Sequence, residues 1–340
     1  MGDHSAECRP DPSVIDRRAF VRAIVAVLAG AGSVSAQPGG KAWRVALVRS
    51  SAPPAAADAV EAAFRKGLSD LGYVEGQNLV IDTRYAAGRY ERYPAMIGEL
   101  LALKPDVIVV GGGPAIRAAQ RATATVPIVA NDLESDPVAS GFIKSLARPG
   151  GNITGLFLDL PELAGKQLQF LQEAVPRMTR VAVLWDPSVN RAPFEATEAA
   201  ARMAGIALLP LSVQRVEDLE TAIARAGRER VKALSALTSP IVFAHRARIS
   251  ELALKHRLPS ICIFSVFPDA GGLMAYGPNF PAIYRRLGPF IDRIFKGASP
   301  ADLPVERPAT FELIINVKTA KALGLTIPQS LLLRADRVIQ

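Results

Sequence analysis

The sequence is poor in cysteine and histidine, the residues that most often build redox, metal and nucleophilic centres. It holds two cysteines and three histidines in 340 residues. Cys8 lies ahead of the first apolar run, and Cys262 stands alone in the apolar stretch ICIF, where a buried structural thiol is expected. If the N-terminal segment is removed on export, no disulfide framework or thiolate metal site can form within one mature chain.

Motifs of the common hydrolases and nucleotide-binding proteins are also missing. The sequence has no GxSxG, HExxH or GxGxxG pattern and no GK[ST] P-loop. Beyond residue 36 the histidines are His245 and His256, which we expect on the surface of a single helix over 241–256. Three helical turns would separate them, too far to share a metal ion. We therefore expect no catalytic residue, metal or cofactor, although a missing motif does not exclude an enzyme.

A run of the roughly 20 apolar residues needed to cross a membrane is lacking as well. The shorter run from Ala23 to Gly32 follows Arg17-Arg18 and precedes Val34-Ser35-Ala36. This order of basic, apolar and small residues is typical of a secretory signal peptide. We predict a signal peptide over 1–36, cleaved near Ala36, and a periplasmic location. The paired arginines favour twin-arginine export, with an ordinary Sec signal as the alternative.

The charge is basic but not concentrated. Lys and Arg number 40 against 32 Asp and Glu, which gives a net charge of +8. A nucleic-acid-binding protein would need a basic patch interleaved with aromatic residues, whereas here the basic residues are scattered and aromatics make up 6% of the chain. We expect a solvated basic surface and no nucleic-acid partner.

What the sequence does have is a repeated alternation of short apolar runs with amphipathic stretches, which is typical of parallel sheets covered by helices on both faces. The first set predicts strands over 43–48, 79–86, 106–112, 126–132 and 153–159, and helices over 55–71, 91–103, 114–122 and 138–146. The second predicts strands over 180–186, 207–213, 231–237, 259–264 and 272–277, and helices over 161–174, 193–204, 217–229 and 241–256.

Two such sets predict an α/β protein of two doubly wound lobes that join near 155–161. A helix over 281–296 is followed by the proline-rich connector SPADLPVERP (299–308), a strand over 311–317 and a helix over 318–323. A chain that ran simply from one lobe to the next would not need this connector, which indicates a further crossing between the lobes.

Polar and glycine-rich segments follow the predicted strands at their carboxyl ends, where open α/β sheets bind ligands. These segments are Arg49-Ser50-Ser51, Gly111-Gly112-Gly113-Pro114, Asn131-Asp132, Glu134 to Asp136, Trp185-Asp186, Thr238-Ser239-Pro240 and Phe264-Ser265.

Each segment has a structural alternative. The glycine run opens a helix, whose N-terminus favours an anion such as a carboxylate, but it could equally be a tight turn. Asp132 and Asp136 could bind an ammonium group, act as acid and base, or cap a helix. Because the segments recur at equivalent positions in both halves, we favour lobes that close around one small molecule.

Four ordered segments carry a family resemblance: LSDLGYVEGQNLVIDTRYAAG (68–88), SDPVASGFIKSLARPGGNITGL (135–156), GGLMAYGPN (271–279) and ELIINVKTAKALGLTIP (312–328). They resemble the ABC transporter substrate-binding proteins of the tryptophan-binding-protein-like group. The resemblance implies a type I periplasmic binding fold with two Rossmann-like lobes and three inter-lobe crossovers. It places lobe 1 at 43–157 plus 278–303, and lobe 2 at 158–277 plus 304–340.

The resemblance also implies the function and the site. A non-enzymatic, monomeric protein would capture an amino acid or a small, possibly aromatic, carboxylic acid and deliver it to an ABC permease in the inner membrane. An exported enzyme on the same fold and a ligand sensor docking on a membrane receptor are the alternatives. The implied ligand contacts are Ser50, Ser51, Gly113, Pro114, Asn131, Asp132, Asp136, Trp185, Asn190, Thr238, Ser239 and Tyr276.

Overall fold

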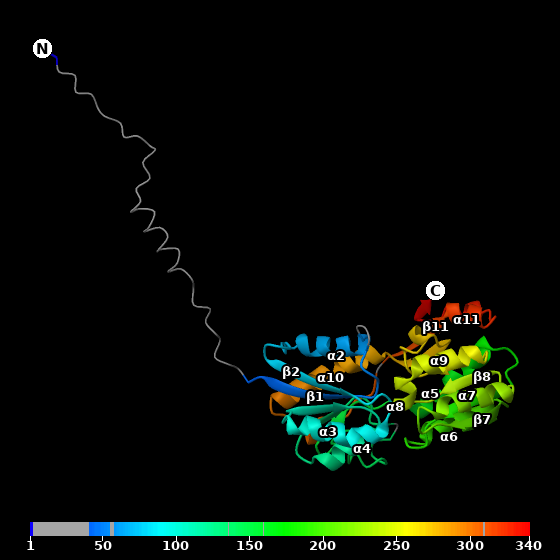
Figure 1. The fold of residues 1–340 in the computed structure, drawn as a ribbon, viewed down its shortest axis with the longest axis horizontal. Coiled ribbons are helices and arrows are strands. Elements are labelled where there is room, and N and C mark those ends of the chain that lie inside the picture. The colour runs from blue at the N-terminus through cyan, green and yellow to red at the C-terminus, as the bar shows by residue number, and fades with distance from the viewer. Residues whose placement is uncertain (3–40, 55–57, 135, 159, 309) are drawn as a thin grey trace. The chain divides into compact units, whose positions relative to one another are not determined.

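The computed structural model describes residues 1–2, 41–54, 58–134, 136–158, 160–308 and 310–340 (Figure 1). The predicted signal peptide and its cleavage point near Ala36 lie outside the described residues. Residues 42–340 form one unit. Among the described helices, none combines the length and the apolar character that a membrane crossing requires.

The first sheet is parallel throughout, and its described strands run in the order β2-β1-β3-β4-β5. Alternate residues of β1 enter different cores: Val45 and Leu47 pack with α2 and α10, while Ala46 and Val48 pack with α3 and α4. Helices therefore cover both faces of the sheet (Figure 1). The elements are β1 (Trp43–Arg49), α2 (Ala59–Ser69), β2 (Leu79–Tyr85), α3 (Tyr93–Ala102), β3 (Val107–Val110), α4 (Gly113–Ala122), β4 (Ile128–Ala130), β5 (Ile153–Gly155) and α10 (Phe280–Phe295).

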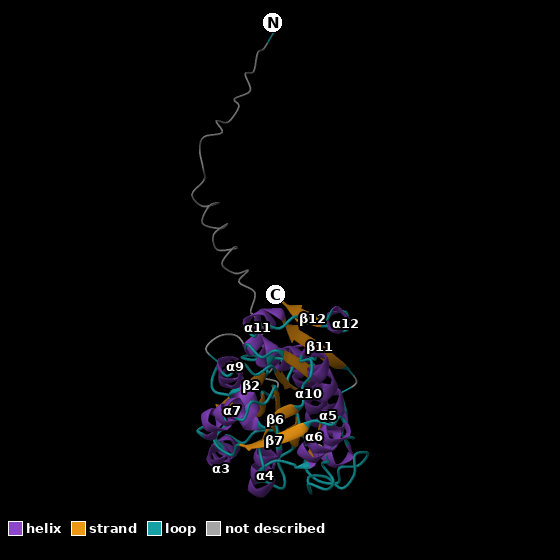
Figure 2. Ribbon diagram, turned by 90° about the vertical axis from the view of Figure 1, so that its right-hand side faces the viewer, coloured by secondary structure: helices purple, strands orange, loops and turns teal. Residues whose placement is uncertain are grey.

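The second sheet has the order β12-β11-β10-β9-β8-β6-β7 among the described residues. Its strands are β6 (Arg180–Trp185), β7 (Ala207–Ser212), β8 (Ala233–Ala236), β9 (Ser260–Cys262), β10 (Met274–Pro278), β11 (Phe311–Asn316) and β12 (Arg337–Ile339). Its helices are α5 (Leu160–Ala174), α6 (Ala192–Met203), α7 (Asp218–Arg228), α8 (Pro240–Ala244), α9 (Arg246–Lys255), α11 (Val317–Ala322) and α12 (Gln329–Leu332). Figure 2 shows β11, β12, α11 and α12 together at one end.

The described chain passes between the two sheets three times. It leaves the first sheet after β5, returns from β10 to α10, and crosses again before β11. The predicted two-sheet α/β fold is therefore confirmed. The lobe limits at 157 and 303 stay a prediction, because strand pairing alone does not fix where a lobe ends.

Three expectations are wrong in detail. Residues 138–146 form turns rather than a helix, because the Asp136 side chain accepts hydrogen bonds from the backbone N–H groups of Val138 and Ala139 and Gly141 adopts a positive φ of 74°. The helix expected over 241–256 breaks at His245 into α8 and α9. Strand β11 pairs antiparallel with β10, since it enters the sheet from the third crossing rather than through a covering helix.

Helix α10 returns late in the chain to pack on α2, far earlier in the sequence (Figure 1). The two backbones meet at Gly67 and Gly288. A Cβ atom on Gly67 would clash with the backbone oxygen of Arg285, and one on Gly288 would clash with the backbone oxygen of Gly67. The absence of side chains at these two positions therefore sets how closely the helices approach.

We expect Gly288→Ala to destabilise the protein by about 1–3 kcal/mol, because the added methyl group must push the helices apart. Urea unfolding of the mature chain measures this free energy. Gly98→Ala is the matched control: Gly98 lies inside α3 with nothing near its Cβ position, so this change should stabilise by about 0.5–1 kcal/mol. Equal unfolding midpoints for the two variants would contradict the close helix contact.

Candidate ligand-binding site

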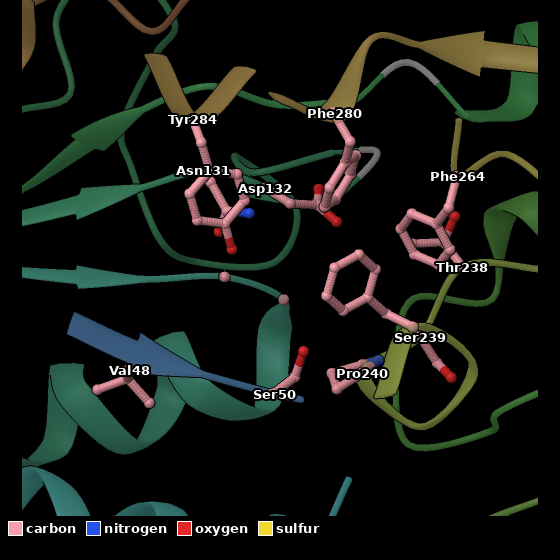
Figure 3. A pocket seen from close by; sticks show the side chains of 13 residues that line it. Val48, Ser50, Asn131, Asp132, Thr238, Ser239, Pro240, Phe264, Phe280 and Tyr284 are labelled. Atoms are coloured by element: carbon pink, nitrogen blue, oxygen red, sulfur yellow. The ribbon is translucent and has the colours of Figure 1, made fainter. Parts of the chain in front are cut away.

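A cavity lies where the carboxyl ends of strands from both sheets meet, as expected for ligand sites in α/β proteins. Residues after β1, β3 and β4 form one side, and residues after β8 and β9 form the other (Figure 3). The lining comprises Val48, Ser50, Gly111, Gly112, Asn131, Asp132, Thr238, Ser239, Pro240, Phe243, Phe264, Phe280 and Tyr284.

Aromatic rings form a continuous apolar wall of this cavity. The ring centroids of Phe243, Phe264 and Phe280 lie 4.9–5.1 Å apart pairwise, two of the pairs in edge-to-face geometry. Tyr284 extends the wall at 5.9 Å from Phe280. Such a cluster presents apolar ring surface and favours an apolar or aromatic ligand group.

A second cavity adjoins the first and shares Gly112, Asp132, Thr238, Ser239 and Pro240 with it. It adds Gly113, Glu134, Val189, Asn190 and Pro193. The two cavities are compartments of one cleft, one aromatic and one acidic. Their volumes of about 30 Å³ and 20 Å³ suit water molecules rather than a whole amino acid. Admission of a larger ligand therefore requires the walls to move apart.

The acidic compartment is built around Asp132 and Glu134, both buried. Asp132 Oδ1 accepts a hydrogen bond from the Glu134 backbone N–H at 3.0 Å. Burial, reinforced by the neighbouring Glu134 carboxylate, raises the pKa of Asp132 to about 7. Glu134 is held from two sides, by Ser140 Oγ at 3.0 Å and by the Arg117 guanidinium at 3.4 Å.

The glycine run at the start of α4 leaves space for neighbouring side chains. A Cβ on Gly111 would clash with Asn131 Oδ1, and one on Gly113 would clash with Glu134 Oε1. The Glu134 carboxylate thus lies beside the first turn of α4, the position predicted for a ligand carboxylate. The positive end of the helix already faces an anion of this chain.

The structure brings some predicted contact residues to the cleft and not others. Ser50, Asn131, Asp132, Thr238 and Ser239 line the aromatic compartment, and Gly113 and Asn190 line the acidic one. Ser239 also caps α8, since its Oγ accepts from the Val242 backbone N–H at 3.1 Å. Five other predicted contacts do not line these two compartments: Ser51, Pro114, Asp136, Trp185 and Tyr276.

Those side chains that lie elsewhere have local packing roles. Trp185 stacks on Phe194 with a centroid distance of 4.5 Å, and Tyr276 packs edge-on against Phe170 at 4.8 Å. Asp136 is exposed and holds the turn that follows it. Cys262 is a free, fully buried thiol as expected, and burial raises its pKa to about 12.

Sequence reasoning missed Phe243, Phe280 and Tyr284 as wall residues. Phe280 and Tyr284 lie one turn apart at the start of α10, directly after β10. Phe243 lies on α8, directly after the polar segment that ends β8. Aromatic residues in the first two turns of a helix that follows a strand end were the signal available in the sequence.

Near the cleft, residues of the half built on the first sheet contact residues of the half built on the second sheet. The Tyr90 hydroxyl donates to Asp186 Oδ2, and Arg117 donates to the Ser188 carbonyl at 3.1 Å. His245 Nε2 lies 3.0 Å from the Ala87 carbonyl oxygen. His245 is half-buried at the bend between α8 and α9, where it contacts Ala87, rather than fully exposed on one continuous helix. Its burial lowers its pKa.

Comparison with known proteins adds independent findings. The sequence matches the family described as ABC transporter substrate binding protein over residues 48–339. A tyrosine-binding protein of Clostridioides difficile (strain R20291) is 25% identical over 272 residues, which cover 79% of this chain and 77% of that protein.

Solved structures share the fold. A conserved domain protein from Vibrio cholerae has a TM-score of 0.79 at 26% identity and covers 88% of this chain and 100% of its own. An ABC domain from Streptococcus pneumoniae in complex with L-Trp has a TM-score of 0.78 at 24% identity, covering 87% and 99%.

The raised pKa of Asp132 predicts a pH-dependent stability. Between its ordinary value of 3.8 and about 7, the folded protein binds a proton that the unfolded chain releases, so this contribution to stability falls as pH rises. Asp132→Asn removes it. From pH 5 to pH 8 the free energy of unfolding of the wild type should fall by about 2–3 kcal/mol relative to the variant, measured by urea unfolding. Parallel pH profiles would contradict the buried carboxyl.

Proposed function

Because the chain belongs to the ABC transporter substrate-binding proteins, we propose that it captures one amino acid with an apolar or aromatic side chain in this cleft. The supporting observation is the division of the cleft. An aromatic wall adjoins a compartment with two buried carboxylate side chains, Asp132 and Glu134.

The chemistry of an amino acid suits this division. Its side chain would pack against Phe243, Phe264 and Phe280, which are buried apolar rings. Its ammonium group would lie near Asp132, where an opposite charge relieves the cost of a buried carboxylate. Asn131 and Thr238 supply neutral hydrogen-bonding groups on opposite sides of the cavity (Figure 3).

Relatives support the same ligand class. The Clostridioides difficile relative is a tyrosine-binding protein, and the Streptococcus pneumoniae structure holds L-Trp. The aromatic wall of this chain is consistent with a ligand of that kind.

The proposed cellular role follows from the family and the N-terminal sequence. The chain would be exported through the signal peptide over 1–36 and would act in the periplasm as a monomer. It would deliver its ligand to an ABC permease in the inner membrane and would catalyse no reaction. The candidate contacts Ser50, Asn131, Thr238, Ser239 and Asn190 would orient the ligand rather than transform it.

Thermal-shift and calorimetric titration of the mature protein with L-tyrosine, L-tryptophan, L-phenylalanine and L-leucine test this proposal. A ligand at 100 times its Kd should stabilise the protein by about 2.7 kcal/mol. Asp132→Asn should weaken binding at pH 8 by at least about tenfold, through loss of a charge-assisted contact. Asp136→Asn, a matched change at an exposed position outside the cavity, should leave it unaltered. Equal affinities for the two variants would refute the ammonium site.

Affinity should also depend on pH. Because the ammonium group needs the ionised form of Asp132, binding below its pKa of about 7 must expel a proton. Wild-type affinity should therefore be about 10- to 30-fold weaker at pH 5.5 than at pH 8, as calorimetry can measure. Asp132→Asn should show a flat profile over this range. An equally steep profile in the variant would assign the titration to another group.

A further inference from the structure

Arg49 is an unusual residue for the interior of a protein. It ends β1, directly before the cavity residue Ser50, and its side chain has 0% exposure. Its guanidinium carbon lies 4.9 Å from the ring centroid of Tyr284. Tyr284 belongs to the cavity wall, so Arg49 lies directly behind that wall.

The guanidinium is only partly satisfied. Its Nη2 nitrogen donates to Asp58 Oδ2 at 3.1 Å, while Asp58 Oδ1 caps α2 by accepting from the backbone N–H groups of Val60 and Glu61. Arg49 Nε and Nη1 are buried and have no hydrogen-bond partner among the described residues. Buried donors without partners are rare in proteins because each costs free energy. A ligand that supplied an acceptor to these two nitrogens would remove that cost.

A second arginine adds to the positive charge. Arg246 begins α9 in the other half, and its guanidinium carbon lies 5.0 Å from the ring centroid of Phe243, another wall residue. Burial lowers the pKa of Arg246, and Asp58 and Arg49 act on it with opposite sign. The carboxylates that act on these two guanidinium groups are Asp58, which is shared by both, and Asp269, which is itself paired with Arg337.

Charged groups of both signs therefore lie along the cleft. Arg49 and Arg246 contact wall rings of the aromatic compartment, Glu134 lines the acidic compartment, and Asp132 lines both. Tyr284 interacts electrostatically with both Arg49 and Asp132, and Figure 3 shows its hydroxyl directed toward the open space of the cavity. The start of α4 is already faced by Glu134, so Arg49 is the better partner for a ligand anion.

We propose that Arg49 binds the carboxylate of the ligand and thereby makes the cleft selective for amino acids over the corresponding amines. This inference rests on the proposed function and deepens it, since it assigns the carboxylate a partner. The guanidinium becomes accessible when the Tyr284 ring rotates away as the cleft opens. Nε and Nη1 then donate to the carboxylate in charge-assisted hydrogen bonds.

Three related probes separate the two charged groups of the ligand: L-tyrosine carries both, tyramine lacks the carboxylate, and 3-(4-hydroxyphenyl)propanoate lacks the ammonium group. Calorimetry at pH 8 gives Kd for each. We expect Arg49→Met to raise the Kd of L-tyrosine and of 3-(4-hydroxyphenyl)propanoate by about 10- to 100-fold. The Kd of tyramine should change by less than about twofold. Arg49→Lys, which keeps the charge, should give a smaller loss with the same selectivity.

Arg44→Met is the matched control, because Arg44 lies on the same strand and pairs with one carboxylate, Asp82, at 2.7 Å. It should leave all three affinities unchanged. A merely structural role for Arg49 predicts equal losses for tyramine and L-tyrosine, and this result would overturn the inference alone. Wild-type protein that binds tyramine as tightly as L-tyrosine would also overturn it. Wild-type protein that binds none of L-tyrosine, L-tryptophan, L-phenylalanine and L-leucine would overturn it together with the proposed function.

Discussion

The packing of α10 on α2 is the constraint on which the cleft depends. The chain has crossed to the second sheet and built most of it before α10 returns to the first. Only the glycines at 67 and 288 allow the two helix backbones to meet. This contact fixes the start of α10, and with it Phe280 and Tyr284, against the carboxyl ends of the first sheet. The cavity wall is therefore made by a contact between segments more than 200 residues apart.

The ionisable side chains buried around this wall do not have the arrangement that would give the folded chain its greatest stability. A carboxyl with a raised pKa lies on one side, and a partly satisfied guanidinium lies on the other. The carboxyl costs free energy when ionised unless an opposite charge is supplied, and the guanidinium, although paired with Asp58, costs free energy while two of its nitrogens lack acceptors. A zwitterion supplies both charges at once, so a single ligand would relieve both costs. In the proposed function, the stability given up at this site would be recovered when the ligand binds.

The sequence was sufficient to predict the two-sheet fold, because the spacing of apolar residues in short strands and amphipathic helices indicates which positions are buried. It failed where local chemistry overrode periodicity. Asp136 and Gly141 turn a helix-like pattern into turns, and His245 breaks one helix in two. Edge elements such as α12 and β12 are too short to give a periodic signal.

The site was predictable only in part, for the same reason. Polar residues after strand ends, such as Asn131 and Thr238, were found because topology brings such ends together. Phe280 and Tyr284 were not, since aromatic residues one turn apart on an amphipathic helix look like core. Arg49 was noticed in its segment but not chosen, because only the packing of α2 and α10 buries it.

The contacts of Tyr90, Arg117 and His245 across the cleft have a consequence for the kinetics of the proposed ligand capture. Both partners of each contact belong to the protein, one on each side of the cleft. These contacts therefore stabilise the closed cleft whether or not a ligand is bound. Such contacts lengthen the residence time of a captured molecule, because they must break before it leaves. They also reduce the fraction of protein open to capture, which lowers apparent affinity by that fraction. In the proposed function, the strength of this small set of bonds would balance retention of the ligand against the speed of its binding and release.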